Sequence, residues 1–348
     1  MRRIMAIYDP DEDYAYRFAE IINRRERMPF EVIAFSSLES LERYAKENNV
    51  AVLMAGGKAD HSRVRAIRAE KRVWLEDGRS LAKDADSMSI YKYQSSDSII
   101  REVMSEYCDS EEITSEDGIR GKAEILGVYS PAETGLRDAF AVTLGRIFSQ
   151  RTPSLYISLE EFSGMGILTG DEFREDLSDL LYYYGAGSYS NVRLGSIVHS
   201  LNGLDFVPPV RCPSDLDLSS EGIIPGLIGT IASESTYRKI ILDLGRCRKV
   251  TPKILAMCAK VYMPLAKNGL SGAKTGEFEE YLKNTGDSSI LDRVQKVYPP
   301  TELPSVSRGY FEQLLWGPMG RYIRGLVMGG AYEEEENRGN GYAGECVG

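Results

Sequence analysis

The chain has 348 residues, a length that predicts two domains, with apolar and charged fractions ordinary for a soluble globular protein. Its formal net charge of −10 argues against nonspecific binding of DNA or RNA as the main task. No apolar run approaches the roughly 20 residues that span a bilayer, and residues 1–8 predict a first strand rather than a signal peptide.

Cysteine and histidine usage predicts neither a disulfide framework nor a metal site. The five cysteines are scattered and form no C-x-x-C pair, as is typical of reduced thiols in a cytoplasm. His61 and His199 have no metal-ligand spacing, and each is expected at the surface or in packing.

The first segment alternates strand patterns with amphipathic helix patterns, which predicts a doubly wound parallel sheet. Its third strand is apolar throughout, as expected of a strand covered on both faces. The predicted strands are residues 4–8, 30–35, 50–54, 73–75 and 89–93, and the predicted helices are 14–24, 38–47 and 96–107.

A second α/β segment follows a polar, acidic stretch that has the composition of a solvated linker. Its predicted strands are 125–129, 154–159, 239–244 and 260–264, with a helix at 139–148 after the first of them. The predicted organisation is a receiver-like domain at 1–107, a linker at 108–122, a P-loop-like domain at 123–329 and a disordered acidic tail at 330–348.

The order and strand lengths of the first segment resemble a response-regulator receiver, which implies a flavodoxin-like sheet. Asp9 and Asp11 follow the first strand, where a receiver holds Mg²⁺, and Lys92 on the fifth strand matches the lysine that pairs with a phosphoryl group. Ala55, at the tip of the third strand, offers no carboxylate to accept phosphate. We therefore expect no phosphotransfer here, and we expect Lys92 to pair with an acid near Asp9.

The turn in residues 130–140 (SPAETGLRDAF) lies between a buried strand and a helix, which is the setting of a phosphate-binding P-loop. It lacks most of that loop's chemistry when it is aligned with the K-G-G-x-G-K-T-T pattern of MinD/ParA ATPases. Arg137 replaces the central lysine, and Asp138 replaces the residue whose hydroxyl holds Mg²⁺. The signature lysine and the glycines are replaced by Ala132, Glu133, Thr134 and Leu136.

These replacements predict a nucleotide pocket that has lost its ligand. Side chains with a Cβ resist the positive φ angles of a phosphate nest. Asp138 is also predicted to lie in the first helical turn and to satisfy the helix N-terminus from within. The remnant of the pocket is predicted to comprise Gly135, Arg137, Asp138, Glu160 at the first-switch position, and Asp243 at the Walker B position.

Across residues 1–328 the chain resembles the TadZ/CpaE proteins of tight-adherence (Flp-type) pilus systems. The segments that carry the resemblance are IYKYQS at 90–95, GVYSP at 127–131, LYISLE at 155–160, FSG at 162–164, DLLYY at 179–183 and VPPV at 207–210. The resemblance implies an atypical receiver domain followed by a MinD-like ATPase domain, a homodimer, and a role with the pilus secretion machinery at the inner face of the membrane. The altered phosphate loop departs from that family, so nucleotide binding is not carried over.

The last predicted helix, residues 308–328, is amphipathic and is interrupted at Gly317-Pro318. Packing on the second domain is the favoured interpretation, and contact with a membrane surface or a partner is the alternative.

The sequence as a whole predicts a noncatalytic or weakly nucleotide-responsive scaffold or localisation factor for pilus assembly, with no cofactor. The alternative is an active ATPase in which Arg137 binds phosphate and Asp138 holds Mg²⁺. A transcription factor of the response-regulator type is least favoured, because no helix-turn-helix signal or basic patch is present.

Overall fold

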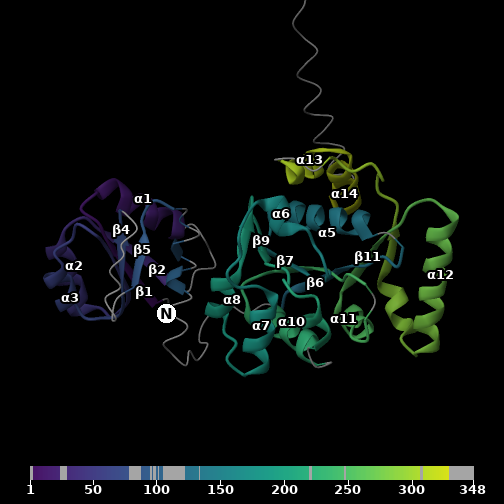
Figure 1. The fold of residues 1–348 in the computed structure, drawn as a ribbon, viewed down its shortest axis with the longest axis horizontal. Helices are drawn as coiled ribbons and strands as arrows, with labels where there is room; N and C mark the ends of the chain where they lie inside the picture. The colour runs from purple at the N-terminus through teal and green to yellow at the C-terminus, as the bar shows by residue number, and fades with distance from the viewer. Residues whose placement is uncertain are drawn as a thin grey trace, which may run out of the picture. The chain divides into compact units, whose positions relative to one another are not determined.

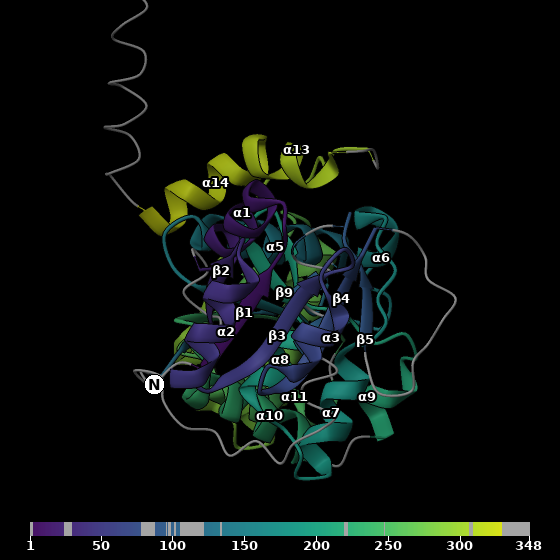
Figure 2. The ribbon, with the colours of Figure 1, turned by 90° about the vertical axis from the view of Figure 1, so that its left-hand side faces the viewer.

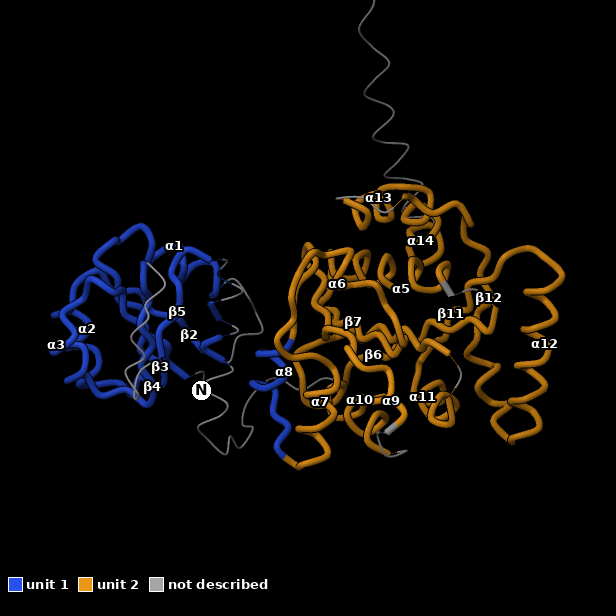
Figure 3. The backbone as a smooth tube through the Cα atoms, in the orientation of Figure 1, with its two compact units in different colours: residues 1–118, 188–197 blue, residues 119–187, 198–348 orange. Residues whose placement is uncertain are grey.

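The computed structural model describes residues 3–23, 30–77, 88–94, 96, 99–100, 102–104, 122–132, 134–218, 222–246, 248–305 and 309–328. The chain forms two compact units, one of residues 1–118 with 188–197 and one of residues 119–187 with 198–348 (Figure 3). Both are mixed α/β structures whose sheets are dominated by parallel pairing. Apart from residue 122, the predicted linker lies outside the described residues, as does the whole predicted acidic tail.

The first unit contains a parallel five-stranded sheet with the strand order β2-β1-β3-β4-β5. This is the order of flavodoxin-like doubly wound sheets. The strands are β1 (Arg3–Tyr8), β2 (Phe30–Phe35), β3 (Val50–Gly56), β4 (Ala69–Glu76) and β5 (Met88–Tyr91), and the helices between them are α1 (Glu12–Asn23), α2 (Leu38–Glu47) and α3 (His61–Ala66).

Helices cover both faces of this sheet, which explains why β3 is apolar and buried along its whole length. Phe18 and Ile22 of α1 pack on one face, and Leu41 of α2 and Val64 of α3 pack on the other. In Figure 2, α2 and α3 lie in front of the sheet. The predicted amphipathic pattern of α1 agrees with the burial of Phe18 and Ile22, whereas Ile21 is exposed.

A short helix from much later in the chain also belongs to the first unit. This helix, α8 (Asn191–Ile197), was predicted as part of the second domain. Val192 packs against the first core, and a Cβ added at Gly195 would lie 3.6 Å from Met104 Cε. The chain therefore leaves the second unit, contributes one helix to the first, and returns.

The second unit contains a seven-stranded sheet with the strand order β12-β11-β6-β10-β7-β9-β8. Figure 1 labels its strands β11, β6, β7 and β9. Among the described strands of this sheet, β8 pairs antiparallel with β9, and the other pairs are parallel. The strands are β6 (Glu124–Val128), β7 (Ser154–Ser158), β8 (His199–Leu201), β9 (Leu204–Val207), β10 (Lys239–Asp243), β11 (Lys260–Pro264) and β12 (Val294–Val297). The helices are α5 (Thr134–Ser149), α6 (Met165–Thr169), α7 (Leu177–Gly185), α9 (Ser214–Leu218), α10 (Ile223–Glu234), α11 (Thr251–Met257), α12 (Gly269–Asn284), α13 (Tyr310–Trp316) and α14 (Pro318–Met328), with a 3₁₀ turn at Ser288–Arg293.

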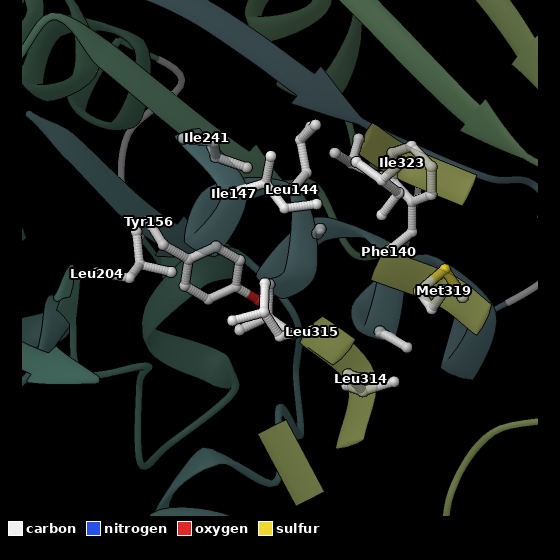
Figure 4. Packing of buried hydrophobic residues seen from close by; sticks show 14 of the residues in the cluster. Phe140, Leu144, Ile147, Tyr156, Leu204, Ile241, Leu314, Leu315, Met319 and Ile323 are labelled. Carbon is white, nitrogen blue, oxygen red and sulfur yellow. The ribbon is translucent and has the colours of Figure 1, made fainter. Parts of the chain in front are cut away.

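Helix α5 is the centre of the second core. Because it is apolar on nearly all sides, it must be covered on all sides. Its Phe140, Leu144 and Ile147 share one buried cluster with sheet residues such as Ile241 and with residues of α13 and α14 (Figure 4). The helix begins at Thr134, so the prediction that it starts at residue 139 was wrong.

The terminal helices pack on the second unit, as the favoured interpretation of the sequence expected. They separate at Gly317, where the glycine-proline step was predicted to interrupt the helix. Their apolar side chains, Phe311, Leu314, Leu315, Met319 and Ile323, are buried in the cluster around α5. Among the described residues, no helix has the length and apolar character needed to span a membrane.

Candidate functional site

Three parallel strands of the second sheet end side by side at the predicted nucleotide pocket. Strand β10 lies between β6 and β7, and Asp243 at its end is level with Val128 and Ser158. The segment after β6 leads into α5, so the first residues of that helix lie above the end of β10. Open α/β sheets bind ligands outside the carboxyl ends of their strands.

Arg137, the fourth residue of α5, occupies this position as a fully buried side chain with 0% exposure. Its Nε donates a hydrogen bond to Asp243 Oδ1 at 2.7 Å, and its Nη2 donates to Asp138 Oδ1 at 2.5 Å. Nη2 also donates to the carboxylate of Glu160. The four residues predicted from separate parts of the sequence therefore meet, with the arginine at their centre.

Tyr156 completes the group, and the sequence analysis did not single it out. Its hydroxyl donates a hydrogen bond to Asp243 Oδ2 at 3.0 Å, so both oxygens of that carboxylate accept a hydrogen bond. Burial, and then the charge of Asp243, raise the pKa of Tyr156 well above its ordinary value. Because a buried tyrosine hydroxyl normally hydrogen-bonds to a polar group, a tyrosine within a buried strand was the sequence signal for this residue. We call Arg137, Asp138, Tyr156, Glu160 and Asp243 the arginine cluster.

Asp138 does not cap the helix, which corrects the prediction. Because α5 starts at Thr134, Asp138 is its fifth residue and lies beyond the first turn, and its carboxylate accepts from Arg137 instead. Burial, and next the negative charge of Asp243, raise the pKa of Asp138 from 3.8 to about 7, against the opposing effect of Arg137. Burial alone would lower the pKa of Arg137, but Asp243, Asp138 and Glu160 together raise it above its ordinary value. Arg137 is therefore permanently charged in this site.

The formal charges of the arginine cluster are unfavourable for a triphosphate. One guanidinium faces the three carboxyl groups of Asp138, Glu160 and Asp243. One guanidinium nitrogen, Nη1 of Arg137, is buried without a hydrogen-bond partner among the described residues. The other two nitrogens are occupied by carboxylates, so a phosphate oxygen could reach this arginine only through Nη1 or by displacing a carboxylate.

The remaining loop residues do not form a phosphate nest. Gly135 is exposed within the first turn of α5, and a Cβ added there would meet no atom within 4 Å. Leu136 is buried in the second core. Ser130 Oγ accepts a hydrogen bond from the Ala132 N–H at 3.3 Å, and Glu133 lies outside the described residues. Of the predicted pocket residues, Gly135 is the one that the structure leaves outside the arginine cluster.

The segment that carries Glu160 is held in place from its other side as well. Glu161 pairs with Arg246 at 2.8 Å and with Arg248 at 3.4 Å, and Arg248 Nη1 donates to the Leu159 carbonyl at 3.0 Å. Gly245 has a φ of +59°, and a Cβ there would lie 2.6 Å from the same carbonyl, so this close approach requires glycine. Residues 159–161 are thus tied to the segment that follows Asp243.

In the first unit, two residues of the predicted receiver pseudo-site, Asp9 and Lys92, form a buried ion pair. Lys92 Nζ lies 2.6 Å from Asp9 Oδ2, with side-chain exposures of 8% and 4%. The same ammonium lies 4.1 Å from the centroid of the Tyr14 ring. The prediction that Lys92 pairs with an acid near Asp9 is confirmed, since its partner is Asp9 itself. Asp11 accepts a hydrogen bond from the Tyr14 N–H at 3.2 Å at the start of α1.

The end of β3 has no room for an acceptor carboxylate. Ala55 is buried, and the strand continues to Gly56, two residues beyond the predicted end at residue 54. A Cβ added at Gly56 would lie 2.6 Å from Asp9 Oδ2. Asp9 therefore lies against a backbone that carries no side chain.

Both histidines contact aromatic rings, and of the described cysteines Cys258 is buried and Cys212 is exposed. His61 stacks on Trp74 at 3.9 Å, and His199 meets the Phe173 ring edge to face at 4.7 Å. Cys212 and Cys258 are free thiols. Within the parts of the chain that the structure describes, no three His, Cys, Asp or Glu side chains are grouped so that they could hold a metal ion.

No protein-family model matches the chain, and no curated protein matches its sequence. Several solved structures are similar to it. A ParA family ATPase from Chlorobium tepidum TLS shares 15% identity at a TM-score of 0.46, over 60% of this chain and 94% of that one. A plasmid partition protein from Borrelia burgdorferi shares 15% identity at a TM-score of 0.39, over 56% of this chain and 97% of that one. Cobyrinic acid a,c-diamide synthase from Mycobacterium smegmatis shares 14% identity at a TM-score of 0.40, over 56% of this chain and 80% of that one. At these identities and TM-scores, the likenesses decide neither the family nor the function of this chain.

Proposed function

We propose that the second unit is a degenerate MinD/ParA-like P-loop domain that works as a scaffold without hydrolysing nucleotide. The observation that carries the proposal is the fully buried Arg137, whose charge is engaged by Asp138, Glu160 and Asp243. An arginine that already neutralises carboxylates of its own chain has little charge left for a ligand. The positions that would serve ATP and Mg²⁺ therefore serve internal pairing.

The residues present do not fit Mg²⁺ and a triphosphate together. The glycines of the phosphate nest are replaced, and positions 134–138 are helical. Displacing the carboxylates from Arg137 would leave them uncompensated in a buried site, which costs several kcal/mol.

The second candidate function, an active ATPase with a deviant loop, is favoured by one observation. Arg137 Nη1 is buried without a partner in the described part of the chain, and such donors normally find one. A phosphate oxygen at that nitrogen would satisfy it. The same feature would support weak nucleotide responsiveness without hydrolysis.

The first unit is proposed to be an atypical receiver that docks partners and does not accept phosphate. The sheet order and the Asp9–Lys92 pair support this proposal. The lysine that would meet a phosphoryl group is occupied by a carboxylate, and Gly56 supplies no acceptor. This unit would then act through its surface, as a dimerising or docking module.

The resemblance to TadZ/CpaE proteins suggests a cellular role for the scaffold. The chain would help to place or assemble the secretion machinery of a tight-adherence pilus, as a homodimer in the cytoplasm or at the inner face of the membrane. Deleting the gene should abolish surface pili, and both the wild-type chain and an Arg137→Lys chain should restore them. Restoration by wild type alone would mean that Arg137 has a role beyond charge.

Calorimetric titration of the full chain with ATP and Mg²⁺ tests the nucleotide part. We expect no binding of micromolar affinity. Binding with a dissociation constant of about 1 μM, some −8 kcal/mol, would support the ATPase alternative if Arg137→Met abolished it while the variant, with Glu160→Gln and Asp243→Asn added to restore stability, remained folded by circular dichroism. The exposed Arg238→Met is the matched control, because it removes a guanidinium outside the arginine cluster.

A further inference from the structure

The corner between α13 and α14 contains a buried arginine without a counter-charge. Arg324 of α14 is 5% exposed, and it makes no ion pair with the described residues. The other two arginines that are buried in the described part of the second unit, Arg137 and Arg146, both pair with carboxylates. Taking an unpaired charge out of water is costly, so a buried guanidinium normally has an anionic partner. Arg324 is therefore the exception that needs an explanation.

The contacts that Arg324 does make supply no net negative charge. Its Nη1 donates a hydrogen bond to the Leu315 carbonyl at 2.9 Å, and its guanidinium carbon lies 4.7 Å from the centroid of the Trp316 ring. Its Nη2 has no hydrogen-bond partner among the described residues. A carbonyl group and an aromatic ring stabilise a cation through partial charges. The formal charge and one donor nitrogen are left uncompensated.

The exposure of Trp316 places this arginine close to the surface. The ring covers the guanidinium, and the tryptophan is 62% exposed. Its Nε1 donates a hydrogen bond to Glu312 Oε2 at 3.0 Å, which holds one edge of the ring. The Glu312 carboxylate itself pairs with Arg146 at 2.7 Å, so its charge is already engaged. Rotation of the Trp316 ring is the movement that would open Arg324 to an anion.

The chain carries a suitable anionic segment shortly after α14. Residues 333–336 are four consecutive glutamates. Arg324 lies four residues before Met328 at the end of α14, about 6 Å along the helix axis. The five residues from Met328 to Glu333 can span about 17 Å, which is enough to return to Arg324 even though helical side chains lean toward the N-terminus. Residues 329–330 are both glycine, the residue type that commonly reverses the chain at a helix end.

We propose that a glutamate of residues 333–336 pairs with Arg324 of the same chain beneath the Trp316 ring. The carboxylate would accept a hydrogen bond from Nη2 and neutralise the guanidinium, and the ring would close over the pair. The short tether favours this occupant over the carboxylate of another protein, because it gives the glutamates a high effective concentration at the site. An acidic segment of a partner could then bind at this corner only by displacing residues 333–336. The pair does not depend on the proposed function, because Arg324 is not part of the arginine cluster.

Scanning calorimetry of the full chain tests the pair. Replacing residues 333–336 together by glutamine should lower the melting temperature of the second unit by at least about 2 °C. The matched control replaces four acidic residues of the predicted linker by their amides and changes the net charge equally; these are Glu111, Glu112, Glu116 and Asp117. At a net charge of −10, removing negative charge lessens repulsion, so the control should not lower the melting temperature. Equal effects of the two sets of substitutions would overturn the proposal.

A double-mutant cycle tests whether Arg324 is the partner. The glutamine substitutions at 333–336 should lower the melting temperature of wild type and should have no further effect in Arg324→Met. Arg324→Lys, which keeps the charge but loses the planar fork, should reduce the effect and provides a second cycle if the methionine variant does not fold. Arg321→Met is the matched control, because Arg321 is an exposed arginine of the same helix, and it should leave the effect unchanged. Additive losses with the Arg324 variants, or equal coupling to Arg321, would overturn the proposal.

Protein concentration separates a pair within one chain from a pair between two copies. The coupling between Arg324 and residues 333–336 should be the same at low and high protein concentration, because the contact is intramolecular. A coupling that grows with concentration would place the glutamates on a second copy and would overturn the assignment to one chain.

Discussion

Arg137 Nε donates to Asp243 Oδ1 at 2.7 Å, joining residues 106 positions apart in the chain. The bond connects the first turn of the central helix α5 to the end of the neighbouring strand β10. Where a P-loop protein would use a lysine and an acid on a bound ligand, this chain uses an arginine and an acid on each other. The pair therefore belongs to the folded structure itself, and it can be tested through stability.

Replacing Arg137 by methionine should destabilise the protein strongly. The change leaves buried carboxylates without their cation, and breaking a buried ion pair typically costs about 3–5 kcal/mol. Urea unfolding of wild type and Arg137→Met measures the difference. Adding Asp243→Asn and Glu160→Gln to the variant should recover part of the loss, because the uncompensated charges disappear. A loss no larger than that of the exposed Arg238→Met would contradict this view of the arginine cluster.

The stability of the protein should depend on the titration of Asp138. Its pKa is raised from 3.8 to about 7 in the folded state, so the folded protein binds more protons than the unfolded chain between these values. The stabilisation from this group is therefore complete below about pH 3.8 and is lost as the pH rises through about 7.

Asp138→Asn should remove that dependence, so the stability of the variant relative to wild type should increase between pH 4 and pH 7 and then level off. Free energies of unfolding at several pH values measure the difference. A difference that stays constant across this range would show that Asp138 does not titrate there.

Two lysines of the first unit offer a matched comparison. Lys92 and Asp9 form a buried pair, whereas Lys58 pairs with Asp77 at 3.6 Å with 83% of its side chain exposed. Lys92→Met should destabilise the first unit by about 3–5 kcal/mol, because Asp9 is left buried and unpaired. Lys58→Met should leave stability unchanged within error, as is usual for exposed pairs. Hydrogen exchange of the first unit measures the stability of both variants. Equal losses would mean that the buried Asp9–Lys92 pair contributes no more than the exposed pair.

Two glycines of α14 make another such comparison. A Cβ at Gly320 would lie 1.7 Å from the Leu315 carbonyl oxygen, whereas a Cβ at Gly325 would meet no atom within 4 Å. Gly320→Ala should therefore force α13 and α14 apart and cost at least about 1–3 kcal/mol. Gly325→Ala should gain about 0.5–1 kcal/mol from helix propensity. Thermal unfolding tests both variants. An unchanged melting temperature for Gly320→Ala would show that α13 and α14 can shift apart without loss of stability.

Regular elements with strong local patterns could be predicted from the sequence. The predicted bounds of β2 and α2 agree with the structure, because apolar periodicity and nearby polar residues define both elements. Strands β8, β9 and β12 were not predicted. They have only three or four residues, too few for a pattern to distinguish them from loops.

The arginine cluster could be predicted in its membership but not in its contacts. Arg137, Asp138, Glu160 and Asp243 lie at strand ends and at a helix start, which parallel topology brings to one edge of the sheet. The contacts of Asp138 depend on where α5 begins, and local sequence does not determine that residue. Because the helix starts at Thr134, Asp138 pairs with Arg137 and does not cap the helix. Tyr156 was missed because it lies within a fully buried strand, where only the tertiary structure supplies a partner for its hydroxyl.

Helix α8 gives the two units a connectivity that a simple tandem arrangement lacks. The chain passes between the units at residues 118–119, 187–188 and 197–198, three times rather than once. A single protease cut within residues 108–122 would therefore leave α8 covalently joined to the second unit, so the N-terminal fragment would stay attached through its noncovalent packing against α8. A fragment that ends at residue 118 would lack one of the helices of its own unit. Gene fusions and truncations that treat residues 1–118 as a detachable module would divide a compact unit, and they would need α8 supplied with it.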